Sequence, residues 1–232
     1  MEEPPGQVSA DGVPLFPLPN CVLFPRVILP LQVFEPRYCS MVEELVTLPE
    51  SRQILAVALL RPGHDDLYHT KTAPIFPVVC TGKVVRWERV DDGRYAILVL
   101  GLDRATVVAE NRARPYRRVH LAPALPPARL GEKEEMELVN RVARVLCQAV
   151  REGLVEKSVI DQLTRPAADL SHLVDILSFH LIPSSDSCIK QRVLEEPDVR
   201  LRAEIVGQWL SEQINLLKRC RERPWPPPLS LN

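Results

Sequence analysis

Prolines interrupt the most apolar stretch of this sequence and restrict how it can fold. Residues 13–45, VPLFPLPNCVLFPRVILPLQVFEPRYCSMVEEL, contain six prolines, at positions 14, 17, 19, 25, 30 and 36. Proline cannot donate to a sheet ladder, so we expect short, bent strand pieces, at residues 22–24 and 27–29. Pro36 suits the first turn of a helix, and the proline-free residues after it predict that helix. The segment is therefore predicted to be core built in short lengths.

Short apolar runs separated by Pro, Gly and Asp continue to about residue 127 and indicate β-structure. Residues 53–60 (QILAVALL) have the length and continuous apolarity of a strand covered on both faces. Asp92 and Gly93 lie between two further runs and predict a β-hairpin, because glycine accepts the positive φ of the turn. The other expected strands span residues 84–90, 95–100, 104–110 and 117–121.

Beyond that point the apolar residues take helical spacing. Leu138 and Val142 belong to an apolar stripe with three- and four-residue intervals, which predicts one long amphipathic helix. Asp169 is placed to cap a second helix. The expected helices span residues 132–152, 170–181 and 186–195, and a fourth begins near residue 197.

These two patterns of apolar residues predict an α+β protein in four parts. Residues 1–12 are expected to be a disordered leader, and residues 13–127 a β-rich lobe. Residues 128–220 are expected to form a helical bundle, and residues 221–232 a proline-rich tail.

Composition and charge restrict the function classes. Hydrophobic residues make up 46% of the 232 residues, and the 29 basic and 30 acidic residues leave a net charge of −1. No overall field would attract nucleic acid or an anionic membrane, and no apolar run has the length of a membrane span. Without a secretory signal, the six scattered cysteines are expected to be reduced and mostly buried, in a cytoplasmic protein.

Motifs for catalysis, metals or cofactors are not found. Gly82-Lys83 lacks the rest of a phosphate-binding loop, and no GxSxG nucleophile motif occurs. The loop residues His64, Asp65, Asp66 and His69 match no closed metal site, and Gly and Asp are expected in such a loop for its turns alone. We expect no catalytic residue, no metal and no cofactor. An enzyme that uses Cys80 or His64 is the alternative.

The strongest basic cluster lies in ENRARPYRRVH. It contains Arg112, Arg114, Arg117 and Arg118 around Tyr116. Arginines with an aromatic residue can hold a single-stranded backbone and stack a base. A charged edge strand, which discourages association between sheets, is the favoured interpretation.

The order of these features resembles the N-terminal substrate-binding domain of Lon proteases over about residues 13–218. In the opening stretch, the matching residues are Pro14, Leu18, Val22, Phe24, Pro25, Pro30, Leu31, Pro36 and Arg37. The resemblance continues through Gly101 and Arg104 to a pattern formed by Lys190, Gln191, Leu194, Glu195, Asp198 and Val199.

This resemblance implies a PUA-like pseudo-barrel followed by a helical bundle. In full-length Lon proteases an ATPase module and a peptidase module with a serine-lysine dyad follow this domain. The sequence contains neither, so we expect a stand-alone, non-catalytic module.

The implied partner is an unfolded polypeptide or another protein, bound by an adaptor in protein quality control. The expected contacts are Tyr68, Phe76 and Tyr116. RNA binding through the PUA-like barrel and the arginine cluster is the alternative.

Overall fold

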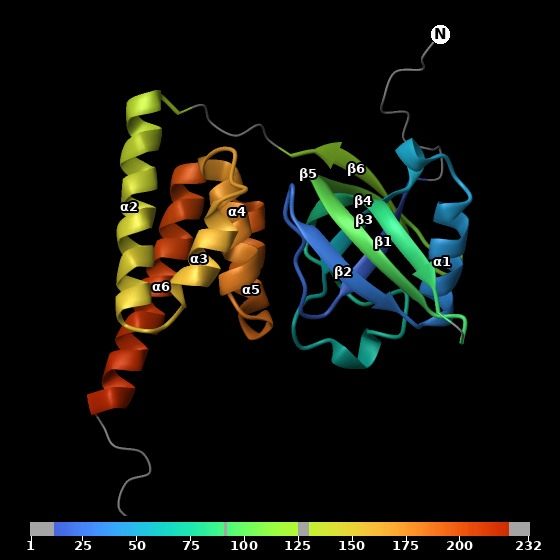
Figure 1. Cartoon of the computed structure of the whole chain (residues 1–232). Helices are drawn as coiled ribbons and strands as arrows, with labels where there is room; N and C mark the ends of the chain where they lie inside the picture. Colours follow the sequence, from blue (N-terminus) through green and yellow to red (C-terminus); the bar gives the residue numbers. More distant parts are fainter. Residues whose placement is uncertain (1–11, 91, 125–129, 223–232) are drawn as a thin grey trace, which may run out of the picture. The chain divides into compact units, whose positions relative to one another are not determined.

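The computed structural model of the chain describes residues 12–90, 92–124 and 130–222, which form two compact units (Figure 1). The first unit comprises the described residues of Met1–Pro126 together with Phe179–Glu195. The second comprises those of Pro127–Ser178 and Glu196–Asn232. The expected combination of a sheet with C-terminal helices is confirmed.

The helices of the described residues include none with both the length and the apolar composition needed to cross a membrane. The expected leader at residues 1–12 and the expected tail at residues 221–232 fall almost entirely outside the described residues.

The described part of the first unit is built on one six-stranded sheet. Its strand order is β2-β5-β4-β3-β1-β6, and β6 also pairs with β5, so five strands close into a ring. Only the β1–β3 pair is parallel among these described strands. The strands are β1 (Val13–Leu18), β2 (Ile28–Val33), β3 (Ile54–Leu59), β4 (Val78–Arg89), β5 (Tyr95–Asn111) and β6 (Arg118–Pro123).

Several prolines lie within strands, contrary to the expectation of short pieces. β1 runs through Pro17 and pairs with β3 without a break, whereas residues 22–24 form no strand. The N–H of Leu15 donates to the carbonyl of Arg117, on the side of β1 where β6 lies. Because strand residues alternate, the nitrogen of Pro17 faces that same side, but β6 does not extend that far. No ladder hydrogen bond is lost there, which is why the strand tolerates a proline.

The runs predicted as strands are mostly confirmed. β3 matches the prediction, and the β4–β5 hairpin turns at Gly93, whose φ is 82°. However, β4 begins at Val78, before the predicted start, and residues 104–110 are not a separate strand but the second half of β5.

Gly101 marks the point where β5 changes neighbours along one edge. The first half of β5 pairs with β2 through Leu100, and the second half pairs with β6 from Ala105. At Gly101 the chain before β2 crosses so closely that a Cβ would lie 2.0 Å from the carbonyl oxygen of Phe24. The N–H of Gly101 donates to Val27 O at 2.8 Å. Only glycine allows this approach.

The described part of the first unit also contains the helices α1 (Pro36–Val46) and α5 (Ser187–Glu195). Pro36 occupies the first turn of α1, as predicted. In α5, Gln191 Nε2 donates to Val78 O of β4 at 2.9 Å, and Arg104 Nε of β5 donates to Leu194 O at 3.1 Å. The sequence predicted a β-rich lobe up to residue 127 and a helical part after it. Although α5 follows residue 127, it belongs to the same unit as the sheet.

The second unit contains α2 (Glu132–Arg151), α3 (Lys157–Thr164), α6 (Val199–Glu222) and the residues of α4 (Leu170–Leu181) up to Ser178. Asp169 caps α4 as predicted, because its Oδ1 accepts the N–H of His172 at 2.7 Å. The short helix α3 was not predicted, and it has no fully buried residue.

A buried ion pair connects α4 and α6 within the second unit. Arg202 Nη1 lies 3.0 Å from Asp175 Oδ1, with the two side chains 2% and 1% exposed. Arg202 Nη2 also donates to Ser171 Oγ at 3.1 Å.

We expect Gly101→Ala to lower the free energy of unfolding by at least about 2 kcal/mol, because the new methyl group meets the backbone of Phe24. Urea unfolding followed by circular dichroism measures this. Gly207→Ala in α6 is the control: nothing lies within 4 Å of its Cβ position, so it should be neutral or stabilise by up to about 1 kcal/mol. Equal losses in the two variants would contradict the close approach.

Asp175→Asn should destabilise the protein by about 3 kcal/mol, because it leaves the buried Arg202 charge without its carboxylate. Glu204→Gln is the matched change at an exposed ion pair, in which Arg141 and Glu204 are 58% and 56% exposed. Its effect should stay below about 0.5 kcal/mol in the same urea titration. A loss that small for Asp175→Asn would show that the buried pair is not needed.

Candidate functional site

The second half of β4 has one edge without a partner strand in the described structure. β3 pairs with β4 only from Val57↔Cys80 to Ile54↔Lys83, and the N–H of Val84 makes the last link, to Gln53 O at 2.9 Å. Residues 86–89 pair with β5 alone. A register shift between Val84 and Arg86 makes Val85 an extra residue, as in a β-bulge.

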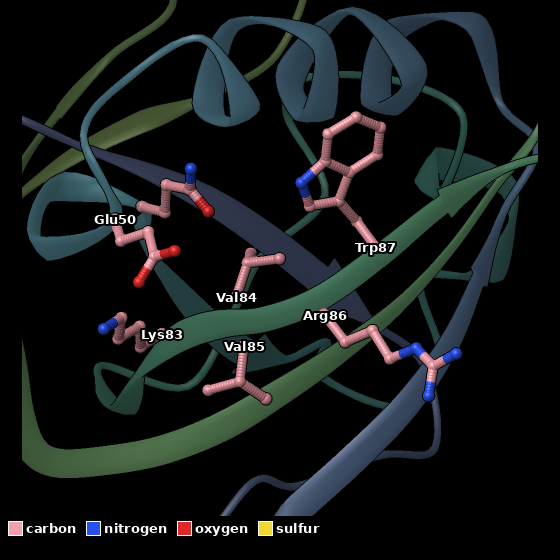
Figure 2. A pocket seen from close by; sticks show the side chains of 7 residues that line it. Glu50, Lys83, Val84, Val85, Arg86 and Trp87 are labelled. Atoms are coloured by element: carbon pink, nitrogen blue, oxygen red, sulfur yellow. The ribbon is translucent and has the colours of Figure 1, made fainter.

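A cavity of about 460 Å³ lies at this edge. Figure 2 shows Val84 and Trp87 on one side of β4 and Val85 and Arg86 on the other. We call this region the β4-edge site, and it is lined by Glu50, Gln53, Lys83, Val84, Val85, Arg86 and Trp87.

Apolar side chains at the β4-edge site remain in contact with solvent. Trp87 and Val85 are each 46% exposed, whereas Val84 is buried beside them. The Trp87 ring lies 6.5 Å from the ring of Tyr95, which supports it on one side. Half-exposed aromatic residues beside a hollow are typical of surfaces that bind other molecules.

Lys83 and Arg86 add positive charge to this site. Among the described residues neither side chain has an ion-pair partner or a hydrogen-bond acceptor. Glu50 supplies a carboxylate on the other wall of the cavity. The site therefore combines an apolar ring, two available cations and unpaired strand backbone.

Tyr68, one of the three expected contacts, lies in the loop between β3 and β4. Arg37 of α1 holds this loop, donating to the carbonyls of Tyr68 at 2.8 Å and Thr70 at 2.9 Å. The Tyr68 side chain is half-buried, and burial together with the carboxylate of Glu35 raises the pKa of its hydroxyl.

Phe76 and Tyr116 have different surroundings. Phe76 is half-buried under the guanidinium of Arg61, 5.0 Å from its ring centroid. Tyr116 is only 2% exposed, and its hydroxyl donates to the Glu44 carboxylate. The three expected contact residues thus have different neighbours within the protein. The ring of Tyr116 lies in the interior rather than on the surface.

All four arginines of the cluster pair with two carboxylates. Glu110 accepts hydrogen bonds from Arg112 and Arg117, and Glu44 accepts them from Arg114 and Arg118. Arg117 and Arg118 are 3% and 7% exposed, and they also donate to the backbone carbonyls of Ala73 and Gly12. These guanidinium groups fasten loops to the sheet instead of forming an open basic strip.

The candidate metal and nucleophile residues are not arranged for chemistry in the described residues. There, no three His, Cys, Asp or Glu side chains are grouped to hold a metal ion. Cys80 is fully buried, and its thiol donates to Thr81 O. Burial raises the pKa of Cys21 to about 11 and also raises the pKa of Cys39. Both thiols are protonated at neutral pH, which makes them poor nucleophiles.

The β4-edge site was not predicted from the sequence. Residues 84–90 have the composition of an ordinary strand, and the extra residue Val85 leaves no clear signature. The best available signal was Trp87, a large aromatic residue between Arg86 and Glu88.

Comparisons with known proteins agree on one family. The family model of the ATP-dependent protease La (LON) substrate-binding domain matches residues 12–212. Lon protease 2 of Sorangium cellulosum is 27% identical over 228 residues, which are 94% of this chain and 27% of that protein. Lon protease 2 of Myxococcus xanthus is 26% identical over 231 residues, 93% of this chain and 26% of that protein. The chain thus spans about a quarter of the length of these relatives.

Solved structures show the same fold. The N-terminal domain of the Mycobacterium avium complex Lon protease superimposes with a TM-score of 0.64 at 17% identity, covering 86% of this chain and 98% of that one. The Lon N-terminal domain protein of Xanthomonas campestris superimposes with a TM-score of 0.58 at 19% identity. The match covers 85% of this chain and 97% of that one. The resemblance drawn from the sequence is confirmed, and the chain belongs to the family of the ATP-dependent protease La (LON) substrate-binding domain.

Proposed function

We propose that this chain is a non-catalytic module that binds unfolded polypeptides through the β4-edge site. The observation that carries the proposal is Trp87, which is 46% exposed beside a cavity and an unpaired strand edge. Unfolded chains display apolar side chains and free backbone groups, and this site can receive both. The family's description as a substrate-binding domain supports the same role.

The module's task is recognition, and it acts as an adaptor in protein quality control beside a separate ATPase or peptidase. The burial of Cys80, which the enzyme alternative would use, supports a binder. Six free cysteines suit a reducing compartment such as the cytoplasm.

We also propose a PUA-like pseudo-barrel for the first unit and a helical bundle for the second. The pairing of β6 with both β1 and β5 supports a PUA-like pseudo-barrel. Two ion pairs support a helical bundle in the second unit: Glu134 of α2 with Arg200 of α6, and Glu152, just after α2, with Lys218 of α6. Tyr68 and Phe76 are secondary contacts in this proposal, because both remain partly exposed.

Trp87→Ala should weaken binding to an unfolded chain at least about fivefold, since the ring supplies the main apolar contact. The probe is fluorescein-labelled, reduced and alkylated α-lactalbumin, which cannot refold, and the readout is fluorescence anisotropy. Tyr68→Ala in the same titration tests the secondary contact. Val108→Ala is the control, because Val108 is 62% exposed on β5 and does not line the cavity. If the unmodified protein fails to bind the probe at about 100 µM, or if Trp87→Ala binds as well as Val108→Ala, the proposal is wrong.

RNA binding is expected to be absent, because the cluster arginines share Glu44 and Glu110. Titration of labelled mixed-sequence RNA oligomers at about 50 and 200 mM salt measures this. An affinity that falls steeply as salt rises would restore the RNA alternative.

A further inference from the structure

The open edge of β4 presents a defined set of backbone groups. The N–H of Val90 donates to Arg94 O at 2.8 Å, so Val90 faces β5. Because strand residues alternate, Glu88 and Arg86 also direct their backbone groups to β5. Trp87 and Arg89 therefore direct their N–H and C=O groups to the open edge. The link from the Val84 N–H to Gln53, on that same edge, agrees with this alternation across the bulge.

A second open edge in the described sheet, that of β2, is protected. The N–H of Gly101 donates to Val27 O at 2.8 Å, so Leu29 and Leu31 face β5, and Pro30 faces outward. Proline has no N–H to offer an incoming strand and is a common guard of sheet edges. Residues 85–89 of β4 contain no proline. The β4 edge is thus the one of the two that can accept a strand.

Side chains at this edge separate into two kinds on the two faces of β4. Trp87 lies on the face of the buried Val84, and the pairing of Trp87 with buried Ile97 agrees with this. Lys83 and Arg86 pair with Leu100 and Leu98, two positions apart on β5, and so share the opposite face. A strand added here would meet an aromatic ring on one face and two cations on the other.

From these observations we propose that the β4 edge binds an extended peptide as an added strand, one with alternating apolar and acidic side chains. The apolar side chains lie against Trp87, and the acidic side chains lie beside Lys83 and Arg86. The peptide takes the place in the sheet that β3 leaves vacant before Ile54. This inference rests on the proposed function and adds to it a binding mode and a preferred sequence chemistry.

Charge complementarity supports the acidic preference. Lys83 and Arg86 have no ion-pair partner among the described residues, and Glu88 is the one carboxylate that the β4–β5 register places on their face of β4. An acidic peptide residue gains two attractive contacts there, whereas a lysine would meet two like charges. Glu50 lies beside Lys83 in Figure 2, on the side of β4 where Val84 lies.

Two labelled peptides test the sequence chemistry by fluorescence anisotropy with the full chain. One alternates valine and aspartate, and the other alternates valine and lysine at the same length. We expect the aspartate peptide to bind at least about tenfold more tightly. The double variant Lys83→Glu, Arg86→Glu should reverse this order, whereas Arg141→Glu in the second unit should keep it. An unchanged order in the double variant overturns the role of the two cations.

Backbone methylation tests the strand mode. Two versions of the aspartate peptide carry N-methyl groups at alternate residues, in one at odd positions and in the other at even positions. An added strand uses the N–H groups of one set only, so one version should lose binding about tenfold and the other should retain it. Equal binding of both versions, or loss of both, overturns strand addition.

The outcomes also separate this inference from the proposed function. Binding of unfolded α-lactalbumin without binding of the aspartate peptide refutes the preferred chemistry and leaves polypeptide recognition intact. Failure of both ligands refutes the proposed function itself.

Discussion

The close approach of the Phe24 backbone to Gly101, which leaves no room for a Cβ, determines how the first unit is assembled. At this point one edge of β5 passes from β2 to β6, so a single strand contributes to three pairings. That sharing allows β6 to return to β1 and close the ring. β3 is occupied by β1 on one side and reaches only the first half of β4 on the other, which leaves residues 85–89 unpaired on that edge. The candidate site is thus a consequence of how the ring closes.

Arginine side chains hold several segments of the chain against this ring. Arg37, Arg104, Arg117 and Arg118 each donate to a backbone carbonyl of a distant segment, at Thr70, Leu194, Ala73 and Gly12. A guanidinium group has five donors in a planar fork, so one side chain can hold a carboxylate and a carbonyl at once. Basic residues in a neutral chain therefore need not mark a surface for nucleic acid.

Local patterns in the sequence predicted those elements whose stability is local. The apolar run of β3, the glycine turn after β4 and the Asp169 cap of α4 each depend on neighbouring residues, and each is confirmed. The errors have long-range causes. Pro17 is tolerated in β1 because its neighbour β6 ends, and Gly101 continues β5 because Phe24 crosses it. Trp87 remains exposed because β3 stops short, which no local pattern around residue 87 can show.

The discontinuous make-up of the first unit has a consequence for its biogenesis. Every strand of the ring precedes the second unit in the chain, but α5, which donates Gln191 Nε2 to Val78 O, follows most of it. As the polypeptide leaves the ribosome, the sheet is without this helix while about fifty residues of the second unit are translated, at roughly 5–20 residues per second. A nascent chain arrested before residue 187 would carry a complete set of strands and an uncovered face of β4.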